Sequence, residues 1–176
     1  MTRLLLLAAL LLPPLGPARS QSAGPTRGTR TDDIIQATRT ERALRGALDR
    51  DGLIAGTSAG ATIQQSDLVR GAPAGNTILM SPGHSTGFGH LTDSAVDQHV
   101  IARHRVTDLS LVVAAHPALL GIGIDEATAI LVQSSRLTVL GRDVVLITDG
   151  ADHDGRPYLP LVRGQPFDLA TRSVVP

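Results

Sequence analysis

The stretch Gly52-Leu53-Ile54-Ala55-Gly56-Thr57-Ser58-Ala59-Gly60 decides the fold, because a short apolar run leads directly into a turn of small residues. A plausible helical stretch follows it, and the order strand, tight turn and helix is the setting of a nucleophile elbow. Ser58 would stand at the apex, and the amides that follow it would lie at a helix N-terminus, where they can stabilise an oxyanion. A Gly/Ser-rich loop without chemistry is the alternative interpretation.

Residues 1–20 have the pattern of a secretory signal peptide. A positive charge at Arg3 precedes the apolar run Leu4 to Leu12, and Ala18-Arg19-Ser20 has small residues at the positions that signal peptidase reads. The run is too short to span a bilayer. We therefore expect a secreted or periplasmic protein with no membrane segment after cleavage, and a retained N-terminal anchor is the alternative.

Composition narrows the function classes. The chain has no cysteine, which excludes disulfides and thiolate metal sites. Its 16 basic and 16 acidic residues give no electrostatic footprint for nucleic acid or an anionic membrane. An apolar content of 42% with two Phe, one Tyr and no Trp predicts an aliphatic core, as in buried parallel sheets.

The order of predicted elements indicates one α/β domain over residues 33–176, after a flexible linker at 21–32. Thr38-x-x-Glu41 has the form of a capping box and predicts that a helix begins there. A second helix is expected over residues 107–115. Strands are expected at 76–80, 120–124, 129–132, 137–140 and 144–147, and residues 81–89 form a loop. The class is α/β, with a parallel sheet and an antiparallel extension.

An activated serine needs a base within hydrogen-bond reach. Of the six histidines, His99 is the best candidate, because it follows a predicted strand end at Ala95-Val96 and sites of α/β sheets gather at carboxyl edges. Alternation along an extended segment would put Asp97 on the same side, where it could orient or stabilise the site. Arg103 and Arg105 could clamp a substrate carboxylate. A solvated polar loop is the alternative.

Three blocks together resemble the serine peptidase family that contains cyanophycinase and dipeptidase E. They are Gly56-Thr57-Ser58-Ala59-Gly60-Ala61, then Asp97-Gln98-His99 with Arg103 and Arg105, then Gly121-Ile122-Gly123-Ile124-Asp125-Glu126. The resemblance covers residues 33–173. It implies an αβα sandwich like that of class I glutamine amidotransferases, and hydrolysis of peptide or isopeptide bonds at aspartyl residues without a cofactor or metal.

The resemblance also implies roles for individual residues. Ser58 would be the nucleophile, His99 the general base, and the Ala59 amide an oxyanion donor. Four further residues match positions that line the site where the substrate is a β-linked aspartyl-arginine unit: Gln98, Arg103, Arg105 and Glu126. Asp125 and Asp97 would support the site.

Two departures from the family pattern predict an impaired enzyme. The family carries further strands ahead of the first helix, so the domain is expected to be N-terminally truncated. Exposed apolar faces would then favour a partner chain such as a second copy. The family also places the acid of the triad in the turn after the elbow helix, and residues 71–76 hold no carboxylate. On this argument neither Glu41 nor Glu126 replaces it.

Two other functions fit parts of the pattern. A non-catalytic remnant or binding module of the same fold is one alternative to a peptidase. An ordinary α/β-hydrolase is the other, since Ser58, Asp125 and His153 fall in the chain order that it requires.

Overall fold

The computed structural model describes residues 4–9 and 38–175. The helices are α2 (Arg39–Asp49), α3 (Ala59–Thr62) and α4 (Asp108–Ala115). The strands are β1 (Leu4–Ala9), β2 (Leu53–Thr57), β3 (Gln65–Asp67), β4 (Leu91–Gln98), β5 (Leu120–Ile124), β6 (Thr128–Gln133), β7 (Arg136–Gly141), β8 (Val145–Thr148), β9 (Leu159–Leu161), β10 (Pro166–Asp168) and β11 (Ser173–Val174).

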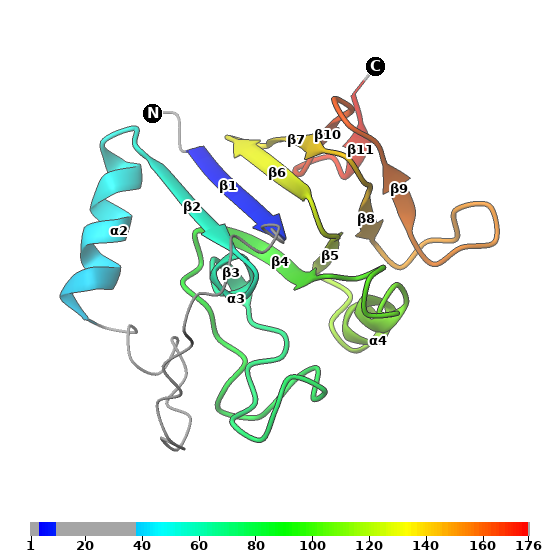
Figure 1. The fold of residues 1–176 in the computed structure, drawn as a ribbon, viewed down its shortest axis with the longest axis horizontal. Coiled ribbons are helices and arrows are strands. Elements are labelled where there is room, and N and C mark those ends of the chain that lie inside the picture. The colour runs from blue at the N-terminus through cyan, green and yellow to red at the C-terminus, as the bar shows by residue number, and fades with distance from the viewer. Residues whose placement is uncertain (1–3, 10–37, 176) are drawn as a thin grey trace, which may run out of the picture.

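The strands form two mixed sheets rather than one (Figure 1). One has the order β11-β10-β7-β6-β1-β2 and the other the order β3-β4-β5-β8-β9. Pairing is parallel for β1–β2, β3–β4 and β4–β5, and antiparallel elsewhere. The predicted α/β class, with a parallel part and an antiparallel extension, is confirmed.

The core is aliphatic, as the composition predicts. The largest cluster of buried side chains joins both sheets, through residues such as Ile122 and Ile147 from one and Ile130, Leu137 and Val139 from the other. All five are fully buried. Such burial contributes about 1.5–3 kcal/mol to the free energy of unfolding for each large aliphatic side chain. The buried contact between the two sheets is therefore a main source of the stability of the fold.

Most of the predicted elements are present. The Thr38 side chain caps α2 by accepting a hydrogen bond from the Glu41 amide at 3.3 Å. Leu48 is buried on the side of that helix that faces the core. Helix α4 and the four strands β5 to β8 lie within one residue of the predicted bounds at each end. The short strands β9, β10 and β11 were not predicted, since they are brief and two contain proline.

The strand predicted at residues 76–80 is wrong, because this segment forms turns. Its carbonyl groups accept hydrogen bonds from one residue instead of a neighbouring strand. The Arg70 side chain bonds Asn76 O at 2.7 Å, and the Arg70 amide bonds Leu79 O at 2.7 Å. The predicted loop at 81–89 has no strand or helix, apart from an isolated bridge between Thr86 and Asp67.

Strand β1 lies in the segment that the sequence analysis assigned to a signal peptide. It is an interior strand of its sheet, parallel to the edge strand β2 and antiparallel to β6 (Figure 1). A run of leucines suits both an export signal and a central strand, so composition does not separate them. Cleavage after Ser20 would remove β1, and secretion stays a prediction. Within the described residues no helix is long and apolar enough to span a membrane.

Replacing Leu6 by proline tests the place of β1. Leu6 pairs with Ala55 on one side and Leu131 on the other. Proline removes a ladder donor and leaves a carbonyl group unpaired, so the free energy of unfolding should fall by about 1–3 kcal/mol. Chemical denaturation measures the change. A free energy of unfolding equal to that of wild type would contradict the position of β1.

Candidate functional site

Ser58 lies in a strained turn between β2 and α3. Its backbone angles are φ 53° and ψ −122°, in a region that non-glycine residues rarely adopt. Such strain costs about 1–3 kcal/mol and persists where the surrounding structure enforces it. The predicted order of strand, tight turn and helix is therefore present, although α3 is shorter than expected.

Gly56 allows this turn, because any side chain there would collide with the following helix. A Cβ atom at Gly56 would lie 2.0 Å from Gly60 O and 2.2 Å from Gln64 Nε2. At Gly60, in contrast, a Cβ atom would meet nothing within 4 Å. Of the two glycines in the pentapeptide, only the first is required sterically.

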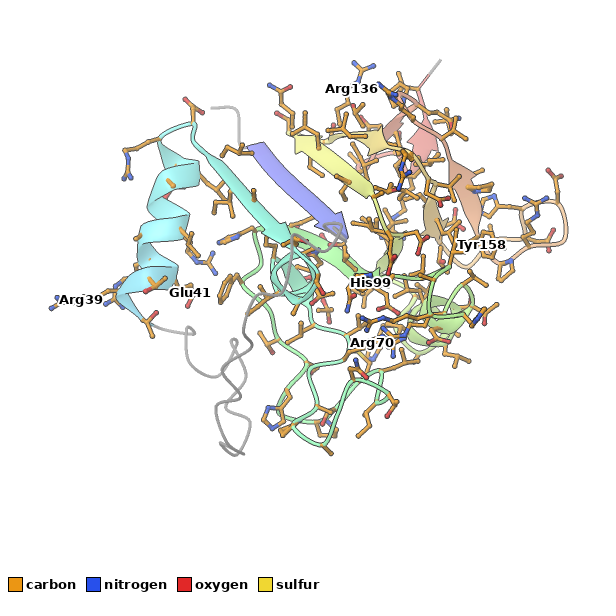
Figure 2. The ribbon with its side chains drawn as sticks, in the orientation of Figure 1. Arg39, Glu41, Arg70, His99, Arg136 and Tyr158 are labelled. Atoms are coloured by element: carbon orange, nitrogen blue, oxygen red, sulfur yellow. The ribbon has the colours of Figure 1, made fainter. Side chains whose placement is uncertain are left out.

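His99 lies at the carboxyl end of β4 and faces the serine. The strand ends at Gln98, and His99 turns out of it with φ 57°. Its Nε2 atom lies 3.3 Å from Ser58 Oγ, and only 4% of the residue is exposed. Figure 2 shows His99 beyond the tip of β4, on the side of the sheet edge where α3 and α4 lie. The predicted juxtaposition of Ser58 and His99 is present.

Glu126 stands on the other side of the imidazole. Its Oε1 atom lies 3.1 Å from His99 Nδ1. The sequence analysis placed Glu126 among the substrate contacts and outside the turn where the family has its acid, whereas here its carboxylate lies next to the imidazole. Strands β4 and β5 are parallel, with Gln98 opposite Ile124, so the residues that follow each strand meet at one edge. The carboxyl-edge rule that singled out His99, applied also to β5, would have found Glu126.

The three side chains form a continuous line from a carboxylate through an imidazole to a hydroxyl. In this arrangement His99 Nδ1–H can donate to Glu126 while Nε2 accepts from Ser58 Oγ–H. The Ser58 hydroxyl also lies 3.5 Å from Gln98 Oε1, a second acceptor. These separations are long for hydrogen bonds of a hydroxyl, as is common in unliganded catalytic sites. Chemically, the line can move a proton away from Ser58.

The two aspartates that were predicted to support the site bind backbone amides and an arginine rather than the His99 imidazole. Asp125 is 4% exposed, and its Oδ1 atom accepts the amides of Ile101 at 2.9 Å and Ala102 at 3.0 Å. It thereby fixes the turn that follows His99. The alternation argument for Asp97 does not apply, because His99 leaves the extended conformation with φ 57°. The fully buried Asp97 carboxylate instead binds Arg70 and the Gln98 amide.

The two predicted arginines differ in environment. Arg103 is exposed, whereas Arg105 is half-buried, with its Nη1 atom 3.8 Å from Asp97 Oδ1. Burial, and then the positive charges of Arg70 and Arg103, lower the pKa of Arg105 below its ordinary value, against the attraction of Asp97. The guanidinium keeps its proton at neutral pH. Arg70 and Arg103 therefore lie close enough to Arg105 for their charges to act on it.

His153 belongs to another part of the molecule. It lies in the turn between β8 and β9, where its Nε2 atom is 2.9 Å from Asp149 Oδ1. Because both this histidine and Asp125 have partners away from Ser58, the order Ser58, Asp125 and His153 does not form a triad.

Within the described residues, no group of three or more His, Asp or Glu side chains is arranged to hold a metal ion.

Comparison with known proteins identifies the family of this chain. The model of peptidase family S51 matches residues 33–140, more than half of the chain. This chain belongs to peptidase family S51. Cyanophycinase of Trichormus variabilis is 37% identical over 141 residues, covering 70% of this chain and 47% of the relative. Cyanophycinase of Synechococcus elongatus is 35% identical over 121 residues, covering 66% and 37%.

A solved structure supports the fold. A peptidase from an acI-B1 Actinobacterium aligns with a TM-score of 0.52 at 22% identity, covering 75% of this chain and 52% of that one. The resemblance stated from the three sequence blocks is confirmed at the level of the family and the α/β fold. The chain spans about half the length or less of the curated relatives it matches.

The two glycines of the pentapeptide form a matched pair for testing the turn. Gly56→Ala should lower the free energy of unfolding by about 1–3 kcal/mol, since backbone must move to admit the methyl group. Gly60→Ala should be neutral or stabilising by up to about 1 kcal/mol, because it replaces a helical glycine in open space. Chemical denaturation compares them. Equal losses would contradict the steric constraint at Gly56.

Proposed function

We propose that this chain is a serine peptidase in which Ser58 is the nucleophile, His99 the general base and Glu126 the residue that orients the base. The observation that supports this most is the line of contacts from Glu126 Oε1 to His99 Nδ1 at 3.1 Å and from His99 Nε2 to Ser58 Oγ at 3.3 Å. Membership in a peptidase family supports the same reaction class. On this proposal the enzyme has its acid and is not impaired at that position.

The arrangement accounts for each proton. Ser58 Oγ attacks the scissile carbonyl carbon while its proton passes to His99 Nε2, and Glu126 stabilises the imidazolium through Nδ1–H. The Ala59 amide, which follows the strained turn at the start of α3, can bind the oxyanion. His99 then gives its proton to the leaving amine, and water, activated by the same base, hydrolyses the acyl-enzyme.

We propose aspartyl peptide or isopeptide bonds as the substrate class, with a β-linked aspartyl-arginine unit as the reference substrate. The relatives named cyanophycinase support this choice. The chain adds a charge argument, because Arg103 and Arg105 lie in the segment that follows His99 and their positive charges act on one another. A substrate with a free carboxylate next to the scissile bond would bind there through charge-assisted hydrogen bonds. Gln98, next to Ser58 Oγ, would contact the substrate at the reacting end.

Labelling with a fluorophosphonate probe tests the nucleophile and its base. Wild type should be labelled, Ser58→Ala should not, and Glu126→Gln should label slower by up to about 10⁴-fold, the loss seen when an orienting acid is neutralised. His153→Ala, in the distant turn, is the matched control for His99→Ala and should label like wild type. A folded wild type that takes up no probe and releases no product from a β-aspartyl-arginine dipeptide would favour the binding module instead.

Arg103→Gln tests the recognition of a carboxylate. Loss of one charge-assisted hydrogen bond, worth about 1.5–3 kcal/mol, should raise KM for the β-aspartyl-arginine dipeptide by about 10- to 100-fold, while probe labelling of Ser58 is unchanged. Steady-state kinetics measure the effect. Arg163→Gln, an exposed arginine in the β9–β10 connection, is the control, and an equal KM in both variants would contradict the proposed contact.

A further inference from the structure

Arg70 is a buried arginine whose guanidinium is bound on all three nitrogen atoms. Nε and Nη2 donate to the two carboxylate oxygens of Asp97 at 2.8 and 2.7 Å, and Nη2 also donates to Asp108 Oδ2 at 2.6 Å. Nη1 donates to Asn76 O at 2.7 Å. The residue is 4% exposed and has φ 58°, in the left-handed region. Arg70 takes no part in the proposed mechanism.

The partners of Arg70 make its charge permanent. Burial alone lowers the pKa of the guanidinium, but the hydrogen bonds and negative charges of Asp97 and Asp108 outweigh burial and raise the pKa above its ordinary value. Buried ion pairs of this kind often add little stability, because desolvation offsets the attraction between the charges. A gain in stability is therefore a weak explanation for a bidentate arginine at this position. The residues that Arg70 binds indicate its role better.

Asp97 and Asp108 stand at the two ends of the segment that carries the site. Between them lie four residues assigned to the base or the substrate contacts, namely Gln98, His99, Arg103 and Arg105. At one end, Asp97 Oδ1 also accepts the Gln98 amide at 2.9 Å, one residue before His99. At the other end, Asp108 is the first residue of α4. One guanidinium thus binds both ends of the segment.

We propose that Arg70 is a positioning residue that sets the imidazole of His99 between Ser58 and Glu126 by clamping residues 97 and 108. This inference rests on the proposed function of His99 as the base. Arg105 does not duplicate the clamp, because its Nη1 atom lies 3.8 Å from Asp97 Oδ1 and makes no hydrogen bond within the described residues. Without Arg70, the buried Asp97 carboxylate would draw Arg105 toward itself and move it away from the substrate.

Arg70→Lys is the sharpest variant, because it keeps the charge but replaces the planar fork with a single ammonium group. A misplacement of a catalytic group by about 1 Å can cost about 10²-fold in rate. We therefore expect kcat for the β-aspartyl-arginine dipeptide and the rate of fluorophosphonate labelling of Ser58 to fall by about that factor. The circular dichroism spectrum should be unchanged. Arg163→Lys, the same substitution at an exposed site, should behave as wild type.

A proton NMR measurement separates this inference from the proposed function. The Nδ1–H of His99 next to Glu126 should give a low-field resonance in wild type and in Ser58→Ala. Detecting this resonance does not require catalytic turnover. In Arg70→Lys that resonance should be lost or shifted, and His153→Ala identifies any signal from the distant turn. If wild type is inert while the resonance depends on Arg70, the proposed function fails and the clamp stands.

Asp108→Asn provides a second route, because it weakens one end of the clamp at a residue whose side chain is 31% exposed. It should shift the His99 resonance in the same direction as Arg70→Lys, by a smaller amount, and lower kcat more than it changes KM. If Arg70→Lys does not fold, this variant decides the question. A resonance and a labelling rate equal to those of wild type in whichever variants fold would overturn the proposal.

Discussion

The site depends on the parallel pairing of β4 with β5. Because the two strands run in the same direction with Gln98 opposite Ile124, the residues that leave them, His99 and Glu126, meet at one edge. An antiparallel pair would send the ends of these strands to opposite sides of the sheet. The buried aliphatic contact between the two sheets holds this edge, and β8 extends it on the far side of β5 without altering the direction of either strand.

Among the residues with positive φ, three redirect the chain shortly after a strand ends. Ser58 leaves β2, Arg70 follows β3 and His99 follows β4, and each has a non-glycine side chain in the left-handed region. Strain of this kind persists only where neighbouring groups enforce it. Here Gly56 makes room for the first turn, and the backbone amides of Gln98 and Ile101, on either side of His99, donate hydrogen bonds to Asp97 and Asp125. Local strain and the buried polar contacts are therefore parts of one arrangement.

Several features of the site were predictable from local sequence. The pentapeptide around Ser58 indicated a tight turn between strand and helix, and the position of His99 after a strand end indicated a base at the same edge. Glu126 was assigned to substrate binding, because the acid was expected between Ser58 and His99 along the chain. Arg70 gave no signal, since a lone arginine after a short strand is usually solvated. Its partners lie 27 and 38 positions further along the chain.

The sequence by itself determined the elements with strong local signals: a capped helix at Thr38, aliphatic strands, a glycine-rich turn at Ser58 and the family to which three blocks point. These depend on propensity, periodicity and turn chemistry, which act over a few residues. Only the tertiary structure decided which carboxylate stands beside His99, which charge neutralises Asp97, and that the leucine run at 4–9 forms an interior strand between β2 and β6. Each of these depends on contacts between segments far apart in the chain, which local sequence does not encode.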